Sequence, residues 1–486
     1  MDQCASTLLA FPPTLANVIL NKESYHEAAS VHTQRLAKLL KEHTRDLVAY
    51  SYELFQVVHP TVNSISYLVL LHALMFPSFA SSVPSEFIQE KIVTFMMLFD
   101  GHQSRYGGTL LLDLLEAVGS GRILPPSVAV DCLAAAILKL DPSGTILTSS
   151  HLALAKLAYE TNNIQAAIPV IDKDIVFYPG MANEVAVHLC DPELPPFMYI
   201  SRVTGLTANV KSAAVLEYDL LCGMIYCSRR EWKKARAALE RAVSFPTKET
   251  GCSKIMVDAF KKWVLVGLLS EGKYLVPQAS SSTAKTFGVL GGPYIALAMA
   301  FASDDVSELR SEAERNMPVW LEDGNVGLVE EVIASYQPWR VLSLQDIYTK
   351  ISIPEIREQT KSAETGAPLN KDEDVESLIQ NMIIEGMLKG VIEKNDDGTK
   401  FLVFLSSTTN LSEQEFAEEI QRAADRLKEL KQVFVTTNQR LGTSREYIRW
   451  AVKETKRDKS GDAQDPTLGF EAQIDDEDLM SGLPSI

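Results

Sequence analysis

The chain is poor in cysteine and in basic residues. Its 486 residues include six cysteines, and no two of them form a Cys-x-x-Cys pair. Such sparse, scattered cysteines favour reduced thiols inside the cell over a disulfide framework. Lysine and arginine number 46 against 63 aspartates and glutamates, which gives a formal net charge of −17. This acidic balance argues against binding to nucleic acid, because phosphate contacts need clustered basic side chains.

Long apolar runs are also missing. The longest, from Ile65 to Phe76, contains His72 and is shorter than the roughly 20 residues that a membrane-spanning helix needs. We therefore interpret it as a buried helix. The first ten residues have no basic stretch ahead of their short apolar run, so we expect no signal peptide. These features predict a protein of the cytoplasm and nucleus that has no contact with a membrane.

The common signatures of catalysis are absent from the sequence. It contains no GxxxxGK[ST] phosphate loop, no HExxH, no GxSxG and no strand-bound GxGxxG. The eight histidines are dispersed, and Cys222 and Cys227 have no further ligands nearby, so we expect no metal and no cofactor. We predict no catalytic residues and no enzyme; an unrecognised enzyme remains an alternative that no group of residues supports.

What the sequence does contain is helical periodicity. With 46% apolar and 22% charged residues, the chain is of globular type. At about 150 residues per domain its length suggests three units or one elongated repeat array. Apolar residues recur every three or four positions over most of Ser24 to Lys273, and Pro or Gly clusters separate the segments. The Ser-rich stretch Gln278 to Thr286 is predicted as a loop.

One pair of predicted helices has the pattern of a tetratricopeptide (TPR) repeat, which combines Gly and Tyr on the first helix with Ala on the second and Pro at its end. The residues that match are Gly223, Tyr226, Trp232, Ala235, Ala238, Ala242 and Pro246. A weaker copy contains Ala155, Tyr159, Ala166 and Pro169. We predict N-terminal helical repeats over residues 1–150 and TPR-like repeats over 151–340, stacked as a solenoid. A non-repeating helical bundle is the alternative.

Residues 341–405 are predicted to form a winged helix. Ser343 is expected to cap a first helix through Ile351, a second begins at Ile353, and a third carries Val375 to Ile383. Two apolar strands around Asp397-Gly398 then predict a hairpin, the wing. The connection from Lys361 to Asp374 is predicted as a solvated loop. The acidic third helix would repel DNA phosphates, which favours contact with protein over contact with nucleic acid.

The region from 411 to 456 is predicted to be helical. Apolar residues there follow alternating spacings of four and three, which is the pattern of a coiled-coil seam that requires partner helices. The residues of this seam are Phe416, Ile420, Ala423, Leu427, Leu430 and Phe434. Residues 457–486 are polar and then acidic, and we expect them to form a disordered tail.

This layout resembles the PCI family, which the proteasome lid, the COP-nine signalosome and translation initiation factor three share. In the winged helix the resemblance rests on Leu342-Ser343-Leu344-Gln345-Asp346-Ile347, Val375-Glu376-Ser377-Leu378-Ile379, Met382 to Met387 and Val403-Phe404. Upstream segments are most similar to the third subunits of the signalosome, and they are Pro169 to Ile175, Gly223 to Tyr226, Ser307 to Arg310 and Asn325 to Val329.

The resemblance implies a mainly α protein, a TPR-like solenoid followed by a winged-helix (PCI) module and C-terminal bundle helices. It implies a non-catalytic scaffold subunit of the complex that removes the ubiquitin-like modifier from cullins, with catalysis in a different, metal-bearing subunit. Its partners would be sister subunits, met through an arc of winged helices and a helical bundle, and cullin-RING ligases only indirectly. The expected bundle residues are Phe416, Ile420, Leu427, Leu430 and Phe434, and the expected wing residues are Ile392, Val403 and Phe404.

Two other functions remain open at this point. The chain could serve as a scaffold in another PCI assembly, the proteasome lid or the initiation factor, and only the identity of its partners separates these cases. It could also be a nucleic-acid adaptor that uses its winged helix.

Overall fold

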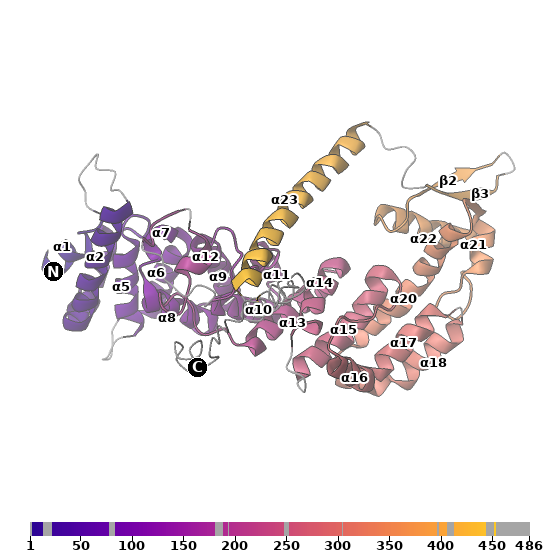
Figure 1. Ribbon diagram of the computed structural model, residues 1–486, viewed down its shortest axis with the longest axis horizontal. Helices are drawn as coiled ribbons and strands as arrows, with labels where there is room; N and C mark the ends of the chain where they lie inside the picture. The colour runs from indigo at the N-terminus through magenta and orange to yellow at the C-terminus, as the bar shows by residue number, and fades with distance from the viewer. Residues whose placement is uncertain are drawn as a thin grey trace, which may run out of the picture. The chain divides into compact units, whose positions relative to one another are not determined.

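The structure is a computed structural model, shown in Figure 1. It describes residues 2–12, 22–76, 83–179, 188–192, 194–246, 252–303, 305–395, 398–405, 413–443 and 452. These residues fall into two units, Met1–Thr409 and Asn410–Ile486. The predicted mainly α architecture of helical repeats, a winged helix and a C-terminal helix is confirmed. The part of the predicted helical region beyond residue 443 and the tail over 457–486 lie outside the described residues, except for Val452.

Helices make up the first unit as far as residue 343, and in Figure 1 they run broadly in chain order from α1 to α18, except that α12 lies near α7. Their bounds are α1 (Asp2–Leu8), α2 (Lys22–Glu42), α3 (Thr44–Ala49), α4 (Ser51–Val57), α5 (Ser64–Met75), α6 (Ser85–Leu98), α7 (Gly101–Ser104), α8 (Gly108–Gly119), α9 (Pro126–Leu140), α10 (Ser149–Thr161), α11 (Ile164–Ile171), α12 (Pro196–Tyr199), α13 (Ser212–Ser228), α14 (Trp232–Val243), α15 (Lys254–Glu271), α16 (Ser281–Leu290), α17 (Gly292–Ala302), α18 (Val306–Arg315), α19 (Met317–Glu322) and α20 (Val326–Ser343).

One hydrophobic core runs through these repeats, from Cys4 to Ala363. It includes nearly all of α5, which confirms the buried helix predicted for Ile65 to Phe76. In the part of the chain that the structure describes, no single helix is long and apolar enough to cross a membrane. Helices α16 and α17 have that length and composition only when they are taken together, and they are bent by 80° where they meet. The core continues without a break past residue 150, so the expected boundary there stays a prediction.

The pair α13 and α14 explains why small residues are needed in the repeat. Ala235, Ala238 and Ala242 are fully buried on one side of α14. A Cβ atom at Gly223 would lie 2.6 Å from the Cγ of Leu239, so the two helices can approach this closely only because Gly223 has no side chain.

A polar contact joins this pair to the preceding one. The hydroxyl of Tyr226 donates to the carboxylate of Asp172 at 2.7 Å, and the ammonium of Lys234 lies 3.0 Å from the same oxygen. Burial raises the pKa of Tyr226, and the bond to Asp172 raises it further. In the weaker copy Tyr159 is exposed, so it has no equivalent role. The strong copy therefore links repeats, whereas the weaker one contributes mainly the buried Ala155.

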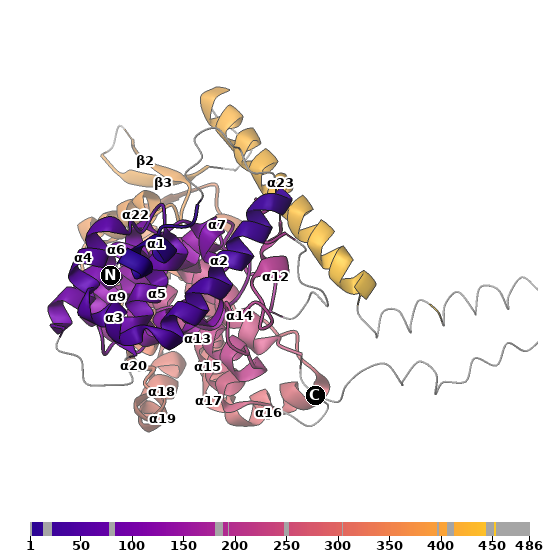
Figure 2. The same cartoon turned by 90° about the vertical axis from the view of Figure 1, so that its left-hand side faces the viewer.

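The winged helix forms a second, smaller core of residues between Val341 and Phe404. Its elements are the 3₁₀ turn η1 (Leu344–Asp346), β1 (Lys350–Ser352), α21 (Ile353–Gln359), α22 (Asp372–Ile384), β2 (Gly390–Lys394) and β3 (Lys400–Phe404). The predicted hairpin is confirmed, since β2 and β3 pair antiparallel. Figures 1 and 2 both place this hairpin beside α22.

The helix predicted from Ser343 to Ile351 is wrong. Ser343 ends α20, only three residues continue as η1, and Lys350–Ser352 form an edge strand in a sheet of order β1-β3-β2. Ile351 is buried opposite Leu402, so pairing with β3 and burial in the small core outweigh the local helical spacing.

Two predicted loops also differ, wholly or in part, from the structure. Ser281–Leu290 is helix α16, and the side chain of Ser280 accepts the backbone N–H of Thr283, so this serine marks a helix start. The connection before α22 is a loop with mostly exposed residues over 361–371, as predicted, but Ala363 attaches it to the repeat core. Asp372, which we had placed in that loop, is already the first residue of α22.

The helix α20 belongs to both cores. Val329, Val332 and Tyr336 lie in the repeat core, whereas Val341 lies in the core of the winged helix. The turn between α19 and α20 is fixed by Asp323, which accepts two bonds of 2.7 Å from Lys261 and one of 2.8 Å from Tyr294. The winged helix is therefore carried by a helix that is anchored in the last repeats.

We expect Gly223→Ala to lower the free energy of unfolding by about 1–3 kcal/mol, because the added methyl group overlaps Leu239. Urea unfolding followed by circular dichroism measures this change. Gly288→Ala is the matched control, since a Cβ at Gly288 in α16 meets no atom within 4 Å. Gly288→Ala should raise the free energy of unfolding by up to about 1 kcal/mol, because alanine favours a helix more than glycine does. Equal effects of the two substitutions would contradict close packing at Gly223.

Candidate assembly interface

The described residues offer surfaces for contact with proteins and no recognisable catalytic cluster. Within the described ranges, no three His, Cys, Asp or Glu side chains come together in a way that could hold a metal ion. All six cysteines are free, and Cys222 is fully buried in α13. The exposed apolar side chains of α23 and of the winged helix are therefore the candidate contact surfaces.

The first surface lies on α23 (Glu413–Thr443), a helix of 31 residues in the second unit. The five residues predicted as bundle anchors are each 54% to 69% exposed, and they are Phe416, Ile420, Leu427, Leu430 and Phe434. At 100° per residue they fall within an arc of roughly 80°, so they form one apolar seam. Away from this seam, polar side chains pair along the helix, as Gln421 does with Asp425 at 3.2 Å.

No second described helix of this unit covers the seam. A single helix with an apolar seam and a charged remainder is typical of a coiled-coil strand, which buries its seam against other helices. Five large side chains left in water also form the kind of patch that marks a protein interface. The α23 seam is therefore an exposed apolar surface of the kind that packs against other helices.

The second surface is the wing. Ile392 pairs with Leu402 across the β2–β3 ladder, and directly paired residues share one face of the sheet. Leu402 is fully buried and Phe404 nearly so, which assigns this face to the winged-helix core. Val403 is on the other face, opposite Val391. The structure thus divides the three predicted wing residues, with Ile392 and Phe404 on the inside and Val403 on the outside.

Three exposed apolar residues of the winged helix were missed by the sequence analysis. Val391 is 48% exposed and lies beside Val403, Ile384 ends α22, and Ile347 follows η1. Because side chains alternate between the two faces of a strand, the position of Val391 next to Ile392 could have predicted its exposure. Ile347 gave no such signal, because the sequence predicts it in a helix that does not form. Because β2 is an edge strand, its outer backbone groups are free to pair with another strand.

The third helix of the module does not suit DNA. The first turn of α22 carries Asp372, Glu373 and Asp374, and Glu376 pairs with Lys400 of the wing at 2.5 Å. Such negative charge at the start of this helix repels phosphates. Contact with protein is the use that this surface favours.

Comparison with known proteins agrees with this geometry. A family model described as COP9 signalosome complex subunit 3, N-terminal helical repeats, matches residues 23–284. Among curated proteins, COP9 signalosome complex subunit 3 of Neurospora crassa is 40% identical over the full length of both chains. The protein of the same name from Emericella nidulans is 28% identical over 90% of each chain. That from Arabidopsis thaliana is 23% identical over 60% of this chain and 58% of its own.

A solenoid of helical repeats that runs into a winged helix, followed by a helix with an exposed apolar seam, defines an assembly subunit of the PCI class. Within this class the chain belongs to the family of COP9 signalosome complex subunit 3, since both the family model and a full-length relative match it.

The two faces of the wing should respond differently to substitution. We expect Phe404→Ala to lower the stability of the winged helix by about 3–5 kcal/mol, because it empties a site in the small core. The half-exposed Val391 is the control, and Val391→Ser should change stability by less than about 1 kcal/mol. Hydrogen exchange of the β2 and β3 amides measures both effects. A larger loss from Val391→Ser than from Phe404→Ala would contradict this assignment of faces.

Proposed function

We propose that the chain is a non-catalytic scaffold subunit of the COP9 signalosome, the complex that removes the ubiquitin-like modifier from cullin-RING ubiquitin ligases. The observation that carries this proposal is the α23 seam, whose five apolar side chains are exposed on a helix that contacts no other helix among the described residues of its unit. Family membership supplies the complex in which such a seam would be covered.

The partners in this proposal are the other signalosome subunits. Helix α23 joins their C-terminal helices in a common bundle through Phe416, Ile420, Leu427, Leu430 and Phe434. The winged helix takes its place in an arc of such modules, with Val403 and Val391 on the outer face of the wing and Ile392 and Phe404 supporting it from inside. The open edge of β2 supports such side-by-side packing, because a neighbouring strand can extend the sheet.

Catalysis in this proposal belongs to a different subunit that brings its own metal. The chain itself holds no cofactor, contacts cullin-RING ligases only indirectly, and works in the cytoplasm and nucleus. We assign the N-terminal repeats to residues 1–150, the TPR-like repeats to 151–340, the winged helix to 341–405, the C-terminal helices to 411–456 and an acidic tail to 457–486.

The first test places charge in the α23 seam. We expect Leu427→Glu with Leu430→Glu to abolish co-purification of sister subunits, because two carboxylates would be buried in the bundle without partners. The repeats and the winged helix should keep their thermal unfolding midpoint, since α23 belongs to a separate unit. Affinity purification of the tagged chain after co-expression measures incorporation.

The control for this test adds the same charge away from the seam. Ala417 lies about 100° and Gln421 about 140° from Phe416 around the helix. The variant Ala417→Glu with Gln421→Glu should therefore leave incorporation unchanged. If the seam variant recovers the sister subunits as the unaltered chain does, α23 is not the bundle helix.

The second test asks which complex contains the chain. Native purification of the tagged chain from its own cells should recover signalosome subunits, and the eluate should remove the modifier from a cullin. That activity should vanish when the metal-bearing subunit is omitted, whereas the chain alone should have none. Recovery of proteasome-lid or initiation-factor subunits in place of these would overturn the assignment.

A further inference from the structure

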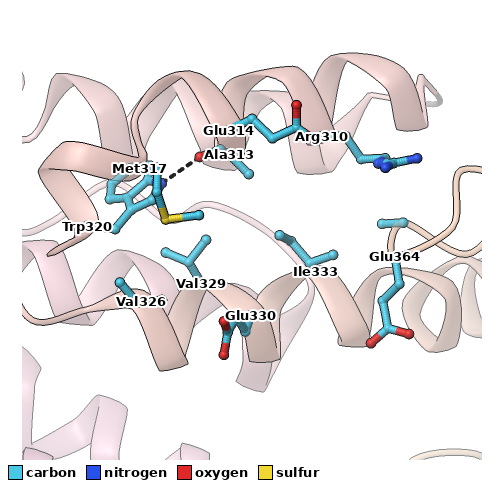
Figure 3. A pocket seen from close by; sticks show the side chains of 11 residues that line it. Arg310, Ala313, Glu314, Met317, Trp320, Val326, Val329, Glu330, Ile333 and Glu364 are labelled. Atoms are coloured by element: carbon cyan, nitrogen blue, oxygen red, sulfur yellow. Dashed lines mark hydrogen bonds between the residues drawn. The ribbon is translucent and has the colours of Figure 1, made fainter.

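A groove separates α18 and α19 from α20 near the end of the repeats. It encloses about 160 Å³. In Figure 3, Met317 and Trp320 on one side face Val326, Val329 and Ile333 of α20 on the other. Trp320 and Val329 are buried and Met317 is 39% exposed, so the groove has a closed apolar floor and an accessible entrance.

The groove is formed in advance of any ligand. The indole N–H of Trp320 donates to the carbonyl of Ala313 at 2.9 Å, which fixes the ring on the floor. The connection between α21 and α22 closes one end, where the buried Ala363 and the exposed Glu364 line the groove. Little ordering is needed on binding, and this favours affinity.

The edge of the groove is acidic. Glu314, Glu330 and Glu364 are exposed, and none of them has an ion pair with another described residue. The carboxylates of Glu314 and Glu330 point away from the apolar floor in Figure 3, toward the two margins. Arg310 is the one basic residue among those that line the groove. Three carboxylates against one guanidinium favour a ligand with positive charge beside its apolar part.

The size and shape select a peptide over a small molecule. Pockets for drug-sized ligands occupy roughly 300–1,000 Å³, which is more than this groove offers. Val326, Val329 and Ile333 follow the spacing of one helix face and span about 10 Å, the length of two helical turns. A groove of this length between helices suits apolar side chains three or four positions apart on another helix.

We propose that this groove binds an amphipathic helix of a partner protein, one that inserts two apolar side chains and carries lysine or arginine on both flanks. This site goes beyond the scaffold function, because it is separate from the α23 seam and from the wing. The connection between α21 and α22 acquires a role here, since it provides one wall.

A phage-displayed library of helical peptides tests the proposal on the full chain. Peptides retained by the unaltered chain are then passed over the Met317→Glu variant, which has a carboxylate at the groove entrance. Because this variant keeps the α23 seam, it captures and removes peptides that bind the seam. We expect the retained peptides to carry Leu, Met or Phe three or four positions apart, flanked by Lys or Arg. Met317 is exposed enough for the variant to fold, which its thermal unfolding midpoint verifies.

Fluorescence polarisation with the best peptide then measures the contribution of the acidic edge. Glu330→Lys with Glu364→Lys should weaken binding at least tenfold and reverse the sign of its salt dependence, because the lining becomes positive and salt then screens a repulsion. Glu308→Lys with Glu322→Lys is the matched control at exposed positions outside the groove, and it should bind as the unaltered chain does.

Four outcomes would overturn the proposal. The library could yield no peptide that depends on Met317, the retained peptides could carry acidic flanks, or the Glu330→Lys with Glu364→Lys variant could bind unchanged. Self-association of the chain that Met317→Glu removes, seen by analytical ultracentrifugation, would assign the groove to a second copy and would also overturn it.

Discussion

The architecture of the first unit depends on one helix that is shared by two hydrophobic cores. Along α20, buried residues pass from the repeat core at Tyr336 to the winged-helix core at Val341 within five positions. Because α20 stays helical across this change, although Pro338 lacks the N–H for one bond of its ladder, the winged helix cannot separate from the last repeat without breaking α20 itself. The repeats, the wing and the groove beside α20 all take their positions from this element.

The interior of α20 is reinforced by polar contacts at the point where the cores meet. The side-chain amide of Gln337 donates to the hydroxyl of Thr360 at 3.2 Å, and both groups are buried. The guanidinium of Arg340 donates to the carbonyls of Phe301 and Ala302 at the end of α17. A cation at that position also interacts favourably with the negative end of the helix dipole. Buried groups that are paired in this way specify one arrangement of the junction.

Much of this fold could be predicted from the sequence, and the errors have a common cause. The α13–α14 pair, the hairpin and the α23 seam depend on local spacing, which the sequence displays directly. Strand β1 was missed because its three residues are held by partners in β3, about fifty positions further along the chain. The start of α16 was missed because serines were read as loop formers although Ser280 caps the helix. The faces of the wing required the register of the ladder, which placed Val403 outside and Ile392 inside.

The connection between α21 and α22 has a mechanical consequence. A module carried by one helix could still twist about the axis of that helix. Ala363 attaches the same module to the repeat core at a second point, away from the α20 axis. An attachment away from the α20 axis prevents rotation about that axis. The first unit therefore transmits a torque applied at its wing to its repeats as a rigid lever would.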